Sequence, residues 1–102
     1  MAADRERLAA LLSQAGPLGV TVMTGSDVVG SVAREVVLLT ELGVPPVAAL
    51  AAATTAARAY LGLPSLSAGA PADVVTYHHD PREDPGVLSR PAAVLRGGHR
   101  IR

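Results

Sequence analysis

The stretch VTVMTGSDVVGSVAREVVLL, residues 20–39, decides the fold that the sequence predicts. Its first five residues are apolar or β-branched and are followed by Gly25. Such near-continuous apolarity is typical of a strand covered on both faces, as in a parallel sheet. A helical pattern begins a few residues later, with polar Thr-Gly-Ser-Asp in between. The order strand, loop, helix therefore places Asp27 just past the carboxyl end of the predicted strand.

Helices are predicted on both sides of this strand. The N-terminal pattern of leucines predicts a helix over residues 4–15, ended by Gly16-Pro17. Apolar residues at helical spacing predict a second helix over 32–42, with Gly43 as its left-handed cap. A proline pair then opens a third helix over 46–61. The first part of the chain therefore reads helix-strand-helix-helix.

The character of the sequence changes near residue 64, because residues 64–102 are rich in Pro and Gly and hold only short apolar groups. Residues 72–78 and 92–97 are the candidate strands, and Gly97-Gly98 predicts a hairpin turn into a third. The fold class is thus α/β, with a small β part of two or three strands. The predicted division places an α/β unit in residues 1–63 and strands in 64–102.

Composition limits the size of the core and the kinds of partner. The 102 residues include no Phe or Trp and only two Tyr, so we expect a thin core built from small side chains. The net charge is zero, and the positively charged residues are all Arg with no Lys. The lack of a net positive charge argues against a nucleic-acid partner. There is no Cys, and no apolar run is long enough to span a bilayer. We therefore expect a cytoplasmic protein without a membrane partner.

Several short motifs occur in a fixed order between Thr24 and Arg102, close to four fifths of the chain. This ordered set resembles the C-terminal part of metal-dependent amidohydrolases, especially the imidazolonepropionase-like group. The motifs that carry the resemblance are Thr24-Gly25-Ser26-Asp27, Arg34-Glu35, Leu42-Gly43, Ala53-Thr54, Ala57-Arg58, Leu61-Gly62-Leu63, Ala72-Asp73 and Asp80-Pro81.

The resemblance implies a fold and a chemistry. The helix-strand-helix-helix part would be a remnant of a metal-dependent TIM-barrel hydrolase, and the later strands part of a small β-sandwich beside it. Asp27 would be both catalytic residue and metal ligand, next to zinc or another divalent metal. In that family this aspartate accepts a proton during attack on an amide-type carbonyl and passes one to the leaving nitrogen. The implied function is hydrolysis of non-peptide C–N bonds in amides or cyclic amides.

The remaining metal ligands of that family have no counterpart in this sequence. A catalytic zinc needs about three protein ligands and an open position, and Asp27 is one. His78 and His79 are adjacent at the end of a predicted strand, where neighbouring side chains point to opposite faces. We expect these two and His99 to be surface residues, and the acidic group Asp80, Glu83 and Asp84 to be solvated. The isolated chain is therefore expected to bind no metal by itself and to be inactive.

Two other interpretations compete with an inactive hydrolase fragment. Asp27 alone would be explained as a helix cap, and the helices over 32–42 and 46–61 as a noncatalytic hairpin that binds another protein. Alternatively, the chain is one half of a split hydrolase. Because a lone barrel strand and its helices leave apolar surface uncovered, we expect self-association or a partner chain that completes the barrel.

Overall fold

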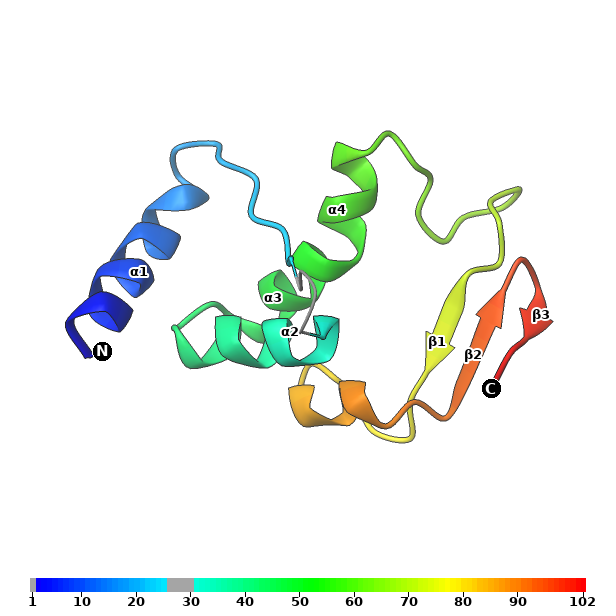
Figure 1. Ribbon diagram of the computed structural model, residues 1–102. Coiled ribbons are helices and arrows are strands. Elements are labelled where there is room, and N and C mark those ends of the chain that lie inside the picture. Colours follow the sequence, from blue (N-terminus) through cyan, green and yellow to red (C-terminus); the bar gives the residue numbers. More distant parts are fainter. Residues whose placement is uncertain (1, 26–30) are drawn as a thin grey trace.

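The structure is a computed structural model that describes residues 2–25 and 31–102. Within these residues, four helices precede a small sheet (Figure 1). The elements are α1 (Ala2–Ala15), α2 (Val32–Glu41), α3 (Pro46–Ala53), α4 (Thr55–Tyr60), β1 (Val74–Thr76), the short 3-10 helix η1 (Pro85–Ser89), β2 (Ala93–Arg96) and β3 (His99–Arg100). This arrangement confirms an α/β protein with a small β part, whereas an origin in a barrel stays a prediction.

The segment over residues 20–25 differs from the prediction, because it is neither helix nor strand. A strand is defined by a hydrogen-bonded neighbour, and the described residues place no other strand beside this segment. Its burial nevertheless alternates: Val22 and Thr24 are half-buried, while Thr21 and Met23 are exposed. This period of two is that of an extended chain, so the local pattern is strand-like and only the pairing is missing.

Glycines in the left-handed conformation end three helical segments in the same way. After α2, Gly43 has φ 97°, its amide donates to the Thr40 carbonyl, and the Val44 amide donates to the Leu39 carbonyl at 3.0 Å. This pair of bonds is a Schellman motif, which satisfies carbonyls that the helix end leaves free. The predicted cap at Gly43 is confirmed. The same bond pattern recurs at Gly62 after α4 and at Gly19, one turn beyond the end of α1.

The single helix predicted over residues 46–61 is two helices, which meet at Thr54. Thr54 has φ −132° and ψ −95°, outside the helical region. Its hydroxyl donates to the Leu50 carbonyl at 2.7 Å, and the carbonyl of Ala52 accepts the amide of Thr24 at 3.2 Å. The prediction of one helix was wrong because a β-branched hydroxyl residue that bonds back to its own helix, together with a long-range bond, favours a break here.

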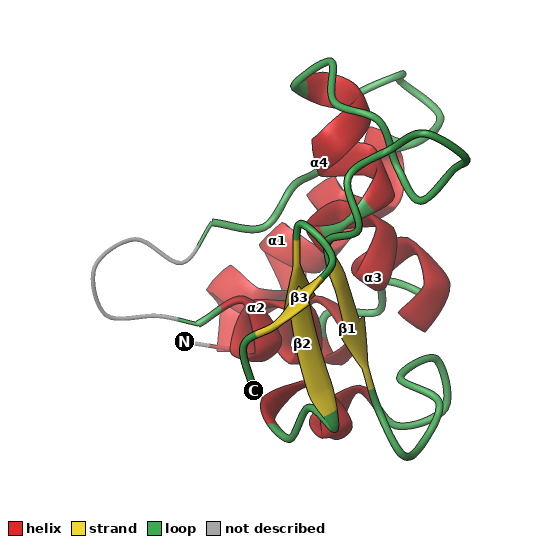
Figure 2. Cartoon of the chain, turned by 90° about the vertical axis from the view of Figure 1, so that its right-hand side faces the viewer, coloured by secondary structure: helices red, strands yellow, loops and turns green. Residues whose placement is uncertain are grey.

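The sheet is antiparallel in the order β1-β2-β3. Figure 1 shows it beside the helices, and Figure 2 shows it in front of them. Gly97 and Gly98, with φ 57° and 82°, form the turn between β2 and β3, as the two positive angles of a type I′ turn require. The Asp73 carboxylate accepts the Gly97 amide at 2.9 Å and thereby ties β1 to the turn. The predicted hairpin is confirmed.

The core is small and consists of small side chains, as the composition predicts. Among the described residues, those buried are Ala15, Val36, Ala49, Ala52 and Val87. Val87 belongs to η1, which packs against α2 and so connects the β part to the helices. The division of the chain near residue 64 stays a prediction.

The chain exposes more surface than a compact domain of its mass. Its accessible surface is 7285 Å², whereas a folded monomer of 10.3 kDa is expected to expose about 5,400 Å². Its radius of gyration is 14.7 Å, compared with about 12.8 Å for a compact domain of this length. Helix α1 accounts for part of the difference, because it packs extensively on no other described element. An exposed ion pair between Arg5 and Glu41, at 3.6 Å, links it to α2.

Candidate functional site

Asp27, the predicted catalytic and metal-binding residue, lies outside the described residues, so its role stays a prediction. The described chain fixes both flanks of this loop. On one side, the Thr24 amide is bonded to the Ala52 carbonyl. On the other, the Ser31 hydroxyl accepts the Arg34 amide at 3.2 Å and caps α2. Since Ser31 performs the capping, the cap considered for Asp27 is not needed at this helix start.

The three histidines do not form a metal site. His78 and His79 are exposed in a bend after β1, and His99 is exposed in β3. The predicted strand over 72–78 is shorter than expected and ends before both histidines. Within the part of the chain that the structure describes, no three His, Cys, Asp or Glu side chains come together as metal ligands. Their predicted surface position is confirmed.

The acidic group after β1 stabilises its own loop. The Asp80 carboxylate accepts the backbone amide of Arg82 at 2.9 Å and forms an ion pair with its guanidinium at 2.7 Å. These hydrogen bonds hold the pKa of Asp80 below its usual value and raise that of Arg82. The Asp84 carboxylate accepts the Gly86 amide at 3.1 Å and caps η1. Both acids therefore act within turns.

Other motif residues have similar local roles. The Arg58 guanidinium donates to the Pro64 carbonyl at 2.6 Å and holds the chain as it leaves α4. Asp73 holds the Gly97 amide, and Thr54 lies at the break between α3 and α4. These motif residues therefore lie at a helix end, at the break between two helices and at a turn, where they fix the path of the chain.

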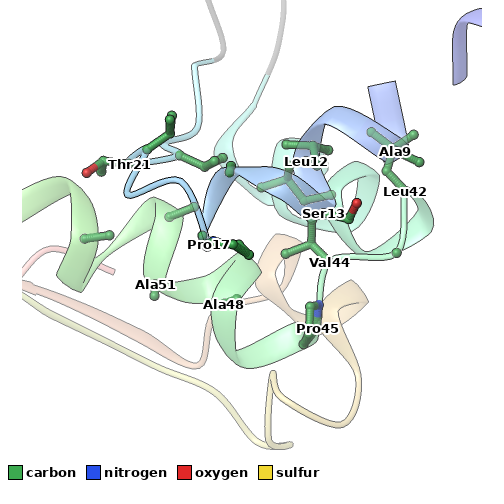
Figure 3. A pocket seen from close by; sticks show the side chains of 18 residues that line it. Ala9, Leu12, Ser13, Pro17, Thr21, Leu42, Val44, Pro45, Ala48 and Ala51 are labelled. Carbon is green, nitrogen blue, oxygen red and sulfur yellow. The ribbon is translucent and has the colours of Figure 1, made fainter. Parts of the chain in front are cut away.

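An apolar cavity of about 600 Å³ lies between α1 and the α2–α3 pair (Figure 3). Leu12 of α1 lines one side, Pro17 and Thr21 lie above α3, and Ala48 forms the opposite wall. Among the lining residues that the structure describes, none has a titratable side chain, and the side-chain polar groups are the hydroxyls of Ser13 and Thr21. Such a lining can cover apolar surface but supplies no group for acid–base chemistry.

A second cavity of about 450 Å³ separates α4 and the following loop from β1. Its titratable residues are Arg58, Asp73 and Tyr77. The first two bond to Pro64 and Gly97, and burial raises the pKa of Tyr77. Sequence reasoning did not identify Tyr77, and strand alternation could not have found it, because Val74 and Tyr77 are half-buried while Val75 and Thr76 between them are exposed. The neutral phenol of Tyr77 and two charged side chains that are already bonded to backbone groups do not form a catalytic site.

Comparison with known proteins finds relatives much longer than this chain. The sequence matches no protein-family model. Uncharacterized proteins of Mycobacterium tuberculosis and Mycobacterium bovis are 41% identical over 85 residues, which covers 78% of this chain and 23% of each relative. Among solved structures, a protein from Bifidobacterium longum described as a putative prolidase matches with a TM-score of 0.76 and 31% identity. That match covers 86% of this chain and 24% of the other.

The length of the relatives also matters for the expected zinc or other divalent metal. The chain spans about a quarter of the length of the relatives that it matches. A catalytic divalent metal needs about three protein ligands, and the described residues bring no such group together. The donor set of the described residues therefore does not fit a metal centre.

The structure also contains, over its described residues, no helix long and apolar enough to cross a membrane.

Proposed function

We propose that this chain corresponds to the C-terminal part of an amidohydrolase-like hydrolase acting on amide or cyclic-amide C–N bonds. The likeness to the Bifidobacterium longum protein carries the proposal, because it extends over 86% of the chain at 31% identity. A fold shared at this level can still host different reactions. The substrate class therefore comes from the resemblance in sequence alone, and the structural match supports only the broader relation to a hydrolase.

Asp27 is the residue to which this proposal assigns chemistry. Its carboxylate accepts a proton from the attacking water and returns one to the leaving nitrogen, the task of a general base that then acts as an acid. Other groups of the site, including the remaining ligands for zinc or another divalent metal, would come from outside this chain. The isolated chain is accordingly expected to be inactive.

A chimera tests the assignment directly. The segment of the Bifidobacterium longum protein that matches this chain is replaced by residues 1–102, and hydrolysis of a panel of dipeptides, N-acyl amino acids and cyclic amides is measured. We expect Asp27→Asn to lower the rate by about 10²- to 10⁴-fold, the usual contribution of a general acid–base. Asp4→Asn, the same change on exposed α1, should leave the rate unchanged. Equal rates for the folded chimera and its Asp27→Asn variant would refute the role of Asp27.

A split hydrolase is the second candidate, and the surface of the chain favours it. The roughly 1,900 Å² beyond the area expected of a compact monomer exceeds the roughly 800 Å² that each partner buries in a standard interface. The test supplies the chain in trans to the Bifidobacterium longum protein that lacks the matching segment. Activity restored in trans would support a split enzyme, whereas activity in the chimera alone would contradict it.

A further inference from the structure

The end of the segment over residues 20–25 is fixed by one backbone bond to α3. The Thr24 amide donates to the Ala52 carbonyl at 3.2 Å, and Ala52 belongs to the core, at 3% exposure. A buried carbonyl without a partner costs free energy, so this bond satisfies a group that would otherwise destabilise the core. Figure 1 shows the segment running from α1 to the junction of α3 and α4. The bond therefore joins two parts of the chain that are far apart in sequence.

This bond depends on the interruption of the helix at Thr54. In a continuous α-helix each carbonyl accepts the amide four residues later. Here the Thr54 hydroxyl takes that place at the Leu50 carbonyl, at 2.7 Å, while the Thr54 amide donates to the Ala51 carbonyl at 3.1 Å. Because φ −132° and ψ −95° at Thr54 break the helical register, the Ala52 carbonyl is left to accept the Thr24 amide.

The sequence around the break favours a continuous helix apart from Thr54 and its neighbour Thr55. Residues 47–61 are rich in Ala and contain neither Gly nor Pro, the usual causes of a break. A hydroxyl that competes for a backbone carbonyl is the local cause that remains. Such a bond alone does not interrupt a helix, because the Thr40 hydroxyl donates to the Val37 carbonyl at 2.6 Å inside α2. The break therefore needs the hydroxyl bond and the bond from Thr24 together.

We propose that Thr54 is a positioning residue, whose hydroxyl keeps the helix interrupted and thereby holds Thr24 against α3. Asp27 follows three residues later in the sequence, and the consequence for catalysis rests on the function proposed for that carboxylate. A displacement of about 1 Å in a reacting group can lower a rate by about 100-fold. Thr54 acts on the reaction only through the backbone bond that it makes possible.

Amide exchange of the full chain, followed by NMR, tests this anchor. Thr54→Ala removes the hydroxyl and introduces the strongest helix former, so α3 and α4 should join. We expect the Thr24 amide to exchange about 10-fold faster, while the helix content measured by circular dichroism rises. Partial unfolding would lower the helix content, so the two measurements together separate a released anchor from a damaged fold. Exchange of Thr24 within about 2-fold of the unaltered chain would overturn the proposal.

Three further variants control this measurement. Thr54→Ser keeps the hydroxyl and should leave Thr24 exchange within about 3-fold. Thr40→Ala removes a hydroxyl bond of the same kind in α2, away from Thr24, and should have as little effect. Acceleration by either variant equal to that of Thr54→Ala would contradict the proposal. If Thr54→Ala lowers the helix content, Thr54→Val decides, because it keeps the branched shape and loses only the hydroxyl: exchange no faster than in Thr54→Ser would overturn the anchor.

The chimera with the Bifidobacterium longum protein measures the effect on the reaction. We expect Thr54→Ala to lower kcat by about 10- to 100-fold with KM within about 3-fold, and Thr54→Ser to restore kcat. Full kcat together with fast Thr24 exchange would refute the positioning role and leave the role of Asp27 intact. If Asp27→Asn instead leaves the rate unchanged, the proposed function fails, and the exchange of Thr24 decides by itself whether Thr54 holds this bond.

Discussion

Val36 is the side chain whose truncation should damage this fold most. It is fully buried, at 0% exposure, and is the largest side chain buried so completely among the described residues. Its helix α2 packs against both α3 and η1, whose buried residues include Ala49 and Val87. Because these neighbours are small or short, they cannot easily move to fill a space that Val36 leaves.

The magnitude of Val36→Ala follows from the lost burial and the cavity. Two buried carbons contribute about 1.6 kcal/mol at 0.8 kcal/mol each, and incomplete collapse of the site adds about 1 kcal/mol. The higher helix propensity of Ala offsets about 0.5 kcal/mol. We therefore expect a net loss of about 2 kcal/mol in the free energy of unfolding. For a domain of about 100 residues this lowers Tm by about 8 to 16 °C.

Urea unfolding followed by circular dichroism measures this loss. Protein concentration is held constant, because association would add to the apparent stability, and the urea m-value is compared between variants. Val32→Ala in the same helix is the matched control: Val32 is half exposed, at 50%, and should change stability by less than about 0.5 kcal/mol. A loss below about 0.5 kcal/mol for Val36→Ala would show that the contacts around Val36 do not hold the fold together.

Three further predictions concern turns and charge. Gly43→Ala should cost about 1 to 2 kcal/mol in thermal unfolding, because φ is 97° there, whereas Gly16→Ala, where no positive φ is required, should cost nothing; equal effects would exclude the conformational explanation. Asp73→Ala should cost about 1 kcal/mol and speed amide exchange in the hairpin turn that its carboxylate holds, and unchanged exchange would contradict that link. Asp80 should titrate below its usual pKa by NMR, and Arg82→Gln should move it back toward the usual value, because the guanidinium is lost while the backbone amide of residue 82 still donates to the carboxylate. Because the folded-state pKa is depressed, any stability from this exposed pair is present above the usual pKa and lost as pH falls through the folded value; an unshifted Asp80 would rule out the pairing.

The sequence predicted the features that depend on neighbouring residues. A glycine after an apolar helical repeat ended α2 at Gly43, and two consecutive glycines formed the turn after β2. The spacing of leucines likewise placed α1 within two residues of its observed start. These features follow from which φ angles a residue can adopt and from the helical period, both of which are local.

The candidate site was predictable only in part. The sequence placed Asp27 after a strand-like segment, and the alternating burial of Val22 and Thr24 agrees with an extended chain. The catalytic and metal-binding role of Asp27 remains a prediction. That Ser31 caps α2 could have been inferred from its position before Val32.

The sequence by itself determined the helix ends, the hairpin turn and the small side chains of the core, because each depends on residue type and short-range geometry. Only the tertiary structure decided that the helix predicted over 46–61 breaks at Thr54, that η1 covers α2, and that residues 20–25 lack a neighbouring strand. These outcomes depend on contacts between residues far apart in the chain. Local patterns cannot specify such contacts, since the energy of a strand edge or a helix face depends on what lies against it.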